Sequence, residues 1–307
     1  MKKIRLGCSD LYVSRLGLGC INFGTLTDEK TAFDIIDGYL EKDGNMLDTA
    51  NNYAIWNGGD GRSSERTIGK WIKNNPGRRE EFVLATKLGA LSKNAGAGFD
   101  DMQGTDRKTI IEETEKSLHT MNIDHIDLLY LHVDDFQTPQ EETMSALTEV
   151  NKKGCVKNIG CSNFRTWRIE RARQICSEND YPFFCAVQQR YSYFQPVADA
   201  DFGVQIAADN ELKNYIGFYK DITLVSHTSL LHGAYFKENI EDSLYDTKQN
   251  REQLQKLKTM KNPAAWVLKY ITEQYGGCVV LFTTNSREHL SANMGIYDDE
   301  LRPKSNC

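Results

Sequence analysis

The sequence contains no long hydrophobic run. Nowhere in its 307 residues do about 18 apolar residues follow one another, which is the length that a membrane-spanning helix needs. The opening MKKIRLGCSD carries two lysines but no apolar stretch behind them, so it lacks the pattern of a secretory signal peptide. We therefore expect a soluble, cytoplasmic protein that is not exported and has no membrane partner.

The sequence also lacks a strong excess of charge of either sign. Its 37 lysines and arginines stand against 43 aspartates and glutamates, which gives a formal net charge of −6. Proteins that bind nucleic acids usually present clustered positive charge. The mild acidic balance therefore argues against a nucleic-acid partner.

Paired cysteines are absent as well. The chain has eight cysteines but no CxxC pair, which is the usual mark of a structural zinc site. A disulfide framework suits small secreted domains, whereas a chain of this length can bury a large core. We interpret the cysteines as reduced thiols and expect no metal site. They are Cys8, Cys20, Cys155, Cys161, Cys176, Cys185, Cys278 and Cys307.

Short apolar runs alternate with amphipathic stretches along the chain. Repeated strand and helix units with right-handed crossovers keep the strands parallel, and eight such units close into a barrel of about 250 residues. The sequence thus predicts an α/β fold, a parallel (β/α)8 TIM barrel, as a single domain over residues 1–307. The predicted strands are RLGLGC, NMLDTA, FVLATK, IDLLYLH, VKNIGCS, FFCAVQQ, ITLVSH and CVVLFTT. The predicted helices lie within residues 28–43, 63–75, 106–122, 139–154, 166–180, 208–221 and 263–277.

Four titratable residues lie at the ends of successive predicted strands. Asp48, Lys87 and His132 end the second, third and fourth strands, and Tyr53 lies in the loop just beyond Asp48. Each residue alone has a simpler explanation, as a cap, a solvated strand end, a core histidine or a half-buried ring. The active sites of such barrels lie at the C-terminal ends of the strands. Four such groups at one rim therefore favour a catalytic site.

These residue types suit the delivery of a proton to an oxygen atom. Tyrosine has an ordinary pKa of about 10, and a neighbouring ammonium lowers that pKa by stabilising the phenolate. We expect Lys87 to supply this charge to Tyr53 and Asp48 to be the counter-ion of Lys87. His132 is expected to orient a carbonyl oxygen. The group would then protonate the oxygen of a carbonyl that is being reduced.

No Rossmann GxGxxG motif follows any predicted strand. Carbonyl reduction also needs a hydride, which no side chain supplies, so we expect a nicotinamide cofactor held across the mouth of the barrel. Hydroxyl and amide side chains at the later strand ends suit the nicotinamide carboxamide, and an imidazole ring suits stacking on the nicotinamide. The residues expected in these roles are Ser162, Asn163, Gln188 and His227.

Together these segments resemble the aldo-keto reductase family over nearly the whole chain. IRLGCSDLYVSRLGLGCINFG is similar to the family's N-terminal β-hairpin and first strand, and LDTANNY, LATK and LLYLH are similar to the segments of its catalytic tetrad. The resemblance implies a hairpin below the barrel, and it implies that IGCSNF and VQQRYS bind the carboxamide of the cofactor. Within the family, the chain is most similar to the bacterial and fungal reductases of the potassium-channel-subunit-like branch. The tetrad positions that it implies are Asp48, Tyr53, Lys87 and His132.

The segment after the seventh predicted strand departs from the family pattern. Relatives usually read Ala-Tyr-Ser-Pro-Leu there, whereas this chain reads SHTSL. His227 thus replaces a larger ring, and Ser229 replaces a proline that stiffens the loop. The resemblance implies that Thr228 and Leu230 also contact the cofactor, and we expect the cofactor to bind less tightly than in relatives.

The resemblance places the adenosine end of the cofactor at FTTNSREHLSAN. Many relatives have a side chain suited to the 2′-phosphate at positions that Thr283, Asn285 and His289 occupy here, and Arg287 is a neighbouring substitute. Family precedent favours NADP(H), and NAD(H) is the alternative. The residues expected at this end are Thr284, Asn285, Ser286, His289 and Asn293.

The predicted substrate pocket is walled by Trp56 and Tyr191, with Phe99 and His132 close by. Aromatic walls hold plain aldehydes and sugars alike. The segment between residues 250 and 266 is shorter than in relatives, and GIYDDELRPKSNC leaves little length for the family's closing helix. We therefore expect the substrate side of the pocket to be more open than usual.

Three functions fit this resemblance. The favoured one is NAD(P)H-dependent reduction of an aldehyde or ketone to an alcohol by hydride transfer, with Tyr53 as the proton donor. The first alternative is a sugar or aldose dehydrogenase that works in the oxidative direction. The second is a nicotinamide-binding regulatory subunit without significant turnover. The sequence predicts a small carbonyl compound or sugar as substrate, and it predicts no oligomeric state.

Overall fold

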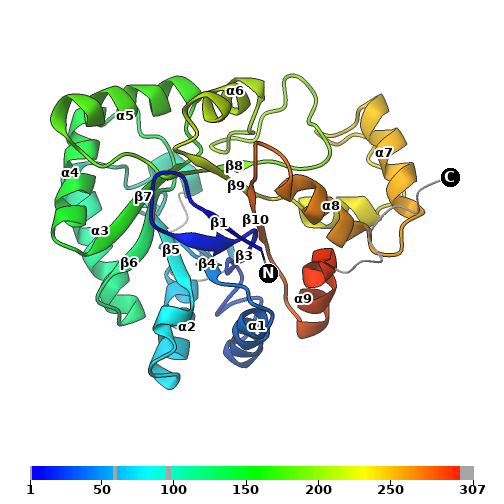
Figure 1. Ribbon diagram of the computed structural model, residues 1–307, viewed down its shortest axis with the longest axis horizontal. Coiled ribbons are helices and arrows are strands. Elements are labelled where there is room, and N and C mark those ends of the chain that lie inside the picture. Colours follow the sequence, from blue (N-terminus) through cyan, green and yellow to red (C-terminus); the bar gives the residue numbers. More distant parts are fainter. Residues whose placement is uncertain (1, 58–60, 95–97, 298–307) are drawn as a thin grey trace.

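A closed barrel of eight parallel strands forms the centre of the molecule (Figure 1). The computed structural model describes residues 2–57, 61–94 and 98–297. Each of the eight predicted apolar runs overlaps one barrel strand, and the closed parallel barrel confirms the predicted fold class. In barrel order the strands are β10 (Val279–Phe282), β3 (Leu16–Gly19), β4 (Met46–Asp48), β5 (Val83–Leu88), β6 (Ile126–Leu131), β7 (Val156–Ser162), β8 (Ala186–Arg190) and β9 (Thr223–His227).

Helices surround the barrel, and each of the seven predicted stretches contains one. These are α1 (Glu29–Glu41), α2 (Ser63–Asn74), α3 (Arg107–Met121), α4 (Gln140–Lys152), α5 (Thr166–Asn179), α6 (Asn210–Tyr219) and α8 (Pro263–Thr272). Two further α-helices of the described residues are α7 (Lys248–Lys258) and α9 (Arg287–Met294). Helix α9 occupies most of the segment FTTNSREHLSAN, where the resemblance places the adenosine end of the cofactor. Of the segment GIYDDELRPKSNC, residues 298–307 lie outside the described residues.

Aspartate side chains fix where several of the helices begin. Asp28 accepts a hydrogen bond from the backbone N–H of Thr31 at 3.0 Å, and Asp106 accepts one from Thr109 at 2.8 Å. Such caps satisfy backbone donors that have no partner inside the helix. The local sequence therefore determines where α1 and α3 begin, independently of tertiary packing.

Each barrel strand separates two apolar layers. Side chains of a strand point alternately to its two sides. In β6, Leu128 belongs to the small cluster inside the barrel, whereas Leu129 belongs to the large cluster between the strands and the helices. In β5, Ala85 lies in the inner cluster, so the same alternation directs Lys87 inward and Thr86 outward.

An N-terminal hairpin closes one end of the barrel, as predicted. Its strands β1 (Lys3–Arg5) and β2 (Tyr12–Ser14) are antiparallel and lie across the barrel in Figure 1. Leu6 packs in the same apolar cluster as the interior residues of the barrel. Gly7 donates its N–H to Thr223 Oγ1 at 2.8 Å, and a Cβ at Gly7 would lie only 2.2 Å from a backbone oxygen of Cys185. Only glycine allows this close approach. Because the hairpin covers this end of the barrel, the opposite end is left for function.

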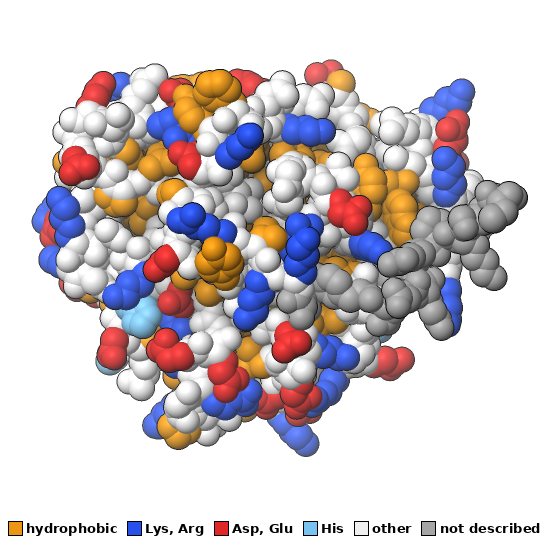
Figure 2. Space-filling view, viewed as in Figure 1, with side chains coloured by type: hydrophobic (Ala, Val, Ile, Leu, Met, Phe, Trp, Pro, Cys, Tyr) orange, Lys and Arg blue, Asp and Glu red, His pale blue; other side chains and the backbone are white. Residues whose placement is uncertain are grey.

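Four further observations concern apolar helices, thiols, metal-ligating side chains and surface charge. Within residues 2–57, 61–94 and 98–297, no helix is long and apolar enough to cross a membrane. The described cysteines are free thiols, and no cluster of metal-ligating side chains occurs in the described part of the chain. On the face drawn in Figure 2, basic and acidic side chains are interspersed.

Candidate active site

The structure brings the four predicted catalytic residues together at the C-terminal ends of neighbouring strands. Asp48 is the last residue of β4, Lys87 lies near the end of β5, and His132 follows β6 directly. The strands β4, β5 and β6 are adjacent in the barrel. Tyr53 lies in the segment between β4 and α2. Barrel closure thus gathers residues that are far apart in the sequence.

The Lys87 ammonium is the centre of this group. Lys87 Nζ donates to Tyr53 Oη at 2.7 Å, to the backbone oxygen of Thr49 at 2.9 Å, and to Asp48 Oδ1. The Tyr53 hydroxyl donates to Asp48 Oδ1 at 3.4 Å. Asp48 and Lys87 are fully buried, and Tyr53 is 8% exposed. The ion pair and the phenol therefore share one water-poor site.

Burial sets the protonation of Tyr53 and Lys87. Burial raises the pKa of Tyr53 well above its ordinary value, and the negative charge of Asp48 adds to this increase. Burial also lowers the pKa of Lys87, although the Asp48 carboxylate opposes that change. The expected lowering of the Tyr53 pKa is thus wrong for this structure, because desolvation of the phenolate dominates. Tyr53 keeps its proton at neutral pH, which a proton donor must do.

His132 lies beside Tyr53 as a neutral ring. The two ring centroids are 5.8 Å apart in an edge-on arrangement. Burial lowers the pKa of His132 well below its usual value, and the charge of Lys87 lowers it further. Its Nδ1 is buried without a hydrogen-bond partner among the described residues. A neutral imidazole with an unused polar atom can hold a substrate oxygen.

Three buried polar side chains line the next two strand ends. Ser162 ends β7 and pairs in register with Gln188 of β8, and the Asn163 N–H donates to the Gln188 backbone oxygen at 3.1 Å. Asn163 Nδ2 donates to Ser162 Oγ at 3.1 Å and to the backbone oxygen of His132 at 2.9 Å. A hydroxyl and two amides can both donate and accept hydrogen bonds. This donor and acceptor set fits a carboxamide, the group that these residues are predicted to hold.

Gln188 has a contact that the sequence analysis missed. Its Nε2 donates to Asp48 Oδ2 at 2.8 Å. Asp48 and Gln188 are 140 positions apart in the chain, so no local pattern marks their contact. Gln188 therefore joins the predicted carboxamide site to the ion pair behind Tyr53.

His227 ends β9, and its side chain bonds the next residue. His227 Nδ1 lies 2.9 Å from Thr228 Oγ1, and Thr228 has a positive φ of 56°. Burial lowers the pKa of His227 to about 3, and the charges of Arg190 and Lys87 contribute. His227 is therefore a neutral ring at physiological pH. Leu230 follows as a partly buried side chain that packs against the large apolar cluster.

The two histidines predict a loss of stability in acid. A histidine whose folded-state pKa lies below its unfolded value binds its proton mainly in the unfolded state, so stability falls as pH decreases through about 6.5. For His132 and His227 this loss is at most about 1.4 kcal/mol per pH unit each. We expect the unfolding free energy, measured with urea, to fall between pH 6.5 and 5. A His132→Asn/His227→Asn variant should show a smaller slope, and an equal slope would contradict the assignment.

The predicted adenosine-binding residues lie on both sides of the start of α9. Ser286 is the N-cap of this helix and accepts from the His289 N–H at 3.1 Å, while Thr284 Oγ1 donates to the Ser286 backbone oxygen at 3.0 Å. His289 Nδ1 lies 3.4 Å from Asn285 Oδ1, both exposed, whereas Asn293 is buried. The segment is therefore a capped helix start.

Arg287 has a carboxylate partner. It forms an ion pair with Glu41 at the end of α1. Both side chains are about half exposed. Arg287, the residue predicted to bind the 2′-phosphate in place of the side chains that relatives use, is thus already paired with a carboxylate of the protein.

Two aromatic residues predicted to line the substrate pocket, Trp56 and Phe99, have exposed rings. The ring of Trp56 is 49% exposed and lies edge-on to Tyr53, with the ring centroids 6.2 Å apart. The exposed ring of Phe99 belongs to a short 3-10 helix, η3 (Gly98–Asp101). Trp56 is therefore placed at the mouth of the barrel, next to the proton donor.

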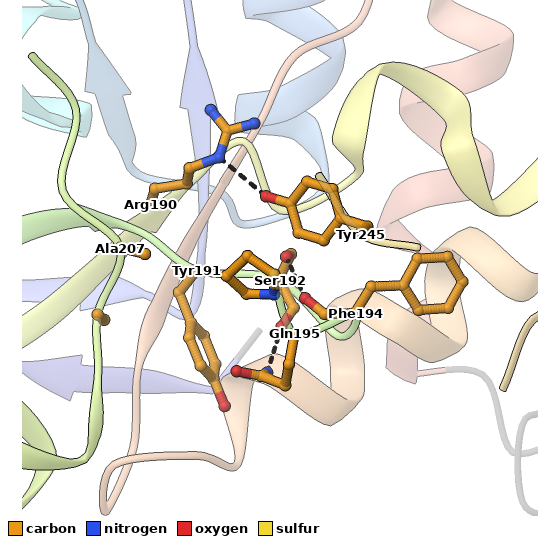
Figure 3. Close-up of a pocket in the computed structure, with 9 residues that line it drawn as sticks. Arg190, Tyr191, Ser192, Phe194, Gln195, Ala207 and Tyr245 are labelled. Carbon is orange, nitrogen blue, oxygen red and sulfur yellow. Dashed lines mark hydrogen bonds between the residues drawn. The ribbon is translucent and has the colours of Figure 1, made fainter. Parts of the chain in front are cut away.

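Tyr191 lies just beyond the end of β8. Its ring packs edge-on against Tyr275, with the centroids 5.1 Å apart, and belongs to the outer apolar layer. In Figure 3, Tyr191 lies beside a small pocket near Arg190, whose Nε donates to Tyr245 Oη at 2.9 Å. The place of Tyr191 in the wall of the substrate pocket stays a prediction.

Known proteins resemble this chain in sequence and in structure. A family model described as "Aldo/keto reductase family" matches residues 15–306. The chain is similar to the uncharacterized oxidoreductase YrpG of Bacillus subtilis (37% identity, covering 66% of this chain and 61% of that protein). It is also similar to the norsolorinic acid reductase stcV of Emericella nidulans (34% identity, 59% and 48%) and to the aryl-alcohol dehydrogenase GME11368 of Pestalotiopsis microspora (31% identity, 60% and 48%).

The matches with these curated relatives thus span about half to three-fifths of their length. Among solved structures, the holo form of the aldo-keto reductase AKR11C1 from Bacillus halodurans has a TM-score of 0.75 at 25% identity. That match covers 97% of this chain and 91% of the solved one. The family model, which spans nearly the whole sequence, decides the assignment. This chain belongs to the aldo/keto reductase family.

Proposed function

We propose that the protein is a cytoplasmic NAD(P)H-dependent oxidoreductase that reduces an aldehyde or ketone to an alcohol, with Tyr53 as the proton donor. One observation carries this proposal. The protonated Tyr53 hydroxyl lies 2.7 Å from Lys87 Nζ at the mouth of the barrel, and the Asp48 carboxylate lies directly behind both. The membership in an oxidoreductase family supports it.

The roles of the residues follow from their chemistry. His132 donates a hydrogen bond to the substrate oxygen and orients it. Tyr53 transfers its proton to that oxygen as negative charge develops there. Lys87 donates to the Tyr53 oxygen and stabilises the phenolate that remains, and Asp48 keeps the charge on Lys87. A bound nicotinamide supplies the hydride.

The polar residues beyond the tetrad are proposed to hold the cofactor. Ser162 and Asn163 would bind the carboxamide together with Gln188, whose oxygen remains for it while the nitrogen bonds Asp48. His227 would lie against the nicotinamide, and Thr228 and Leu230 would contact the cofactor further along. The adenosine end would rest on the residues around the start of α9, namely Thr284, Asn285, Ser286, His289 and Asn293.

Aromatic aldehydes are the first substrates to test. The half-exposed Trp56 ring beside Tyr53 offers a surface for stacking, and one relative is named an aryl-alcohol dehydrogenase. A panel of aromatic and aliphatic aldehydes, ketones and sugars is assayed with NADPH and NADH, and the sugars also with the oxidised cofactors. Loss of reduced-cofactor absorbance with aldehydes supports the proposal. Turnover of sugars alone with an oxidised cofactor would support the dehydrogenase, and binding without turnover would support the regulatory subunit.

The Arg287 ion pair predicts how the two cofactors compare. Glu41 competes with a 2′-phosphate for Arg287, so we expect Glu41→Gln to lower the dissociation constant of NADPH about two- to fivefold and to leave that of NADH unchanged. Calorimetric titration of both cofactors measures this. Glu288→Gln is the matched control, because Glu288 is an exposed carboxylate in the first turn of α9. An equal gain in both variants would show only a general effect of charge.

A further inference from the structure

A set of buried charged residues behind the Tyr53 segment has no part in the proposed chemistry. The side chain of Glu65 in α2 is fully buried and that of Glu113 in α3 is 3% exposed, and the side chain of Arg62, just before α2, is 14% exposed. Arg62 Nη1 donates to Glu65 Oε2 at 3.0 Å, and Arg62 Nη2 donates to Glu113 Oε2. One guanidinium thus links two carboxylates on neighbouring helices.

The network reaches the catalytic strand at one end. Thr86, which alternation directs outward from β5, donates its hydroxyl to Glu65 Oε1 at 2.8 Å. Thr86 precedes Lys87 in the chain, so the position of Lys87 is tied to Glu65 through one hydrogen bond and one peptide unit. The helix α2 is thereby fixed against the strand that carries the catalytic ammonium.

The network reaches the Tyr53 segment at the other end. Asn51 Nδ2 donates to Glu113 Oε2 at 2.7 Å, and the Asn51 N–H donates to the backbone oxygen of Lys87 at 3.0 Å. The backbone oxygen of Asn51 also accepts from the Arg62 N–H at 2.9 Å. Asn51 is two residues before Tyr53. A closed path of contacts therefore joins Lys87 to Tyr53 from behind.

Stability alone is a poor reason for this arrangement. Buried ion pairs seldom stabilise a fold relative to apolar residues of the same size, because each charge must leave water. Burial raises the pKa of Glu65 despite the nearby Arg62. Arg62 also has a positive φ of 56°, a conformation that costs energy in a residue other than glycine. The partners of Glu113, by contrast, lower its pKa despite burial and so favour its charged form. The ion pairs therefore hold one specific geometry around a charged Glu113.

We propose that Glu113 is a positioning residue for the reaction. Through Asn51 and Arg62 it holds the backbone of residues 51–53 against β5, so that the Tyr53 hydroxyl stays within hydrogen-bond distance of Lys87. Glu113 contacts neither substrate nor cofactor. This inference rests on the proposed reductase function.

The central experiment compares Glu113→Gln with Glu115→Gln. Both substitutions remove one carboxylate from α3, but Glu115 is exposed and lies outside the network. We expect Glu113→Gln to lower kcat about 10- to 100-fold with little change in KM or in cofactor affinity, because a small misplacement of a catalytic group is costly. Glu115→Gln should match the wild type. Asn51→Ala should lower kcat similarly, and the double variant Asn51→Ala/Glu113→Gln should lose less than the product of the single losses.

Amide hydrogen exchange gives a readout that needs no turnover. In Glu113→Gln we expect faster exchange of the Asn51 and Tyr53 amides, which are bonded to Lys87 and Ala50, and unchanged exchange in β6 and β7. A fully active Glu113→Gln variant with wild-type exchange would overturn the inference. If the wild type itself reduces no carbonyl, the proposed function fails, and exchange still decides whether Glu113 fixes the segment. If Glu113→Gln does not fold, Asn51→Ala carries both measurements.

Discussion

A Tyr53→Phe enzyme is expected to fold normally, to bind the nicotinamide cofactor, and to reduce carbonyl compounds about 100- to 10,000-fold more slowly than the wild type. The substitution removes only the hydroxyl that lies 2.7 Å from Lys87 Nζ. The ring remains and keeps its edge-on packing against His132 and Trp56. The loss should therefore appear in kcat measured at saturating substrate, with the dissociation constant of the cofactor unchanged.

The control for this experiment is Tyr12→Phe. Tyr12 is exposed on the hairpin at the opposite end of the barrel, so the same chemical change there should leave kcat unaltered. Full carbonyl-reducing activity in Tyr53→Phe would show that another group donates the proton. The tetrad would then be a structural cluster.

Replacing Lys87 by methionine should remove both activity and stability. The variant leaves the Asp48 carboxylate buried without a cation, which costs about 3–5 kcal/mol of unfolding free energy. It also removes the donor to the Tyr53 oxygen, so kcat should fall at least about 100-fold. Equilibrium unfolding in urea at pH 7 measures the first effect, and the aldehyde assay measures the second.

A second substitution separates these two effects. Asp48→Asn together with Lys87→Met removes the unpaired charge, and we expect most of the lost stability to return because neutral pairs of similar shape replace buried ion pairs well. Activity should stay low, since the Tyr53 phenolate still lacks its cation. Activity that returned together with stability would show that the pair serves only the fold.

The barrel and the cluster of the four proposed catalytic residues at its rim were predictable because their signals are local. A buried parallel strand must be apolar along its length, so a charged residue such as Lys87 at the end of FVLATK stands out. Neighbouring strands of a barrel end at the same edge, which brings Asp48, Lys87 and His132 together without any knowledge of side-chain packing. The hairpin was implied by the family resemblance and is present.

The features that the sequence did not predict depend on contacts between distant segments. The direction of the Tyr53 pKa shift is set by burial, to which the negative charge of Asp48 adds, and burial is a property of the whole fold. The pairing of Arg287 with Glu41 joins positions 246 residues apart. The segment that contains α9 is predicted only to contact the cofactor, although Ser286 caps a helix there.

The hairpin also has a consequence for the order of folding. Gly7 bonds Thr223, a partner 216 positions later, and Cys8 donates its N–H to the backbone oxygen of Asp221 at 2.8 Å. Loop closure over such a distance precedes any gain from the contact, so these bonds form late. During synthesis the residues of the hairpin must wait for β9 before the floor of the barrel can close. The hairpin is thus synthesised before β9 but takes its place only after β9 has formed.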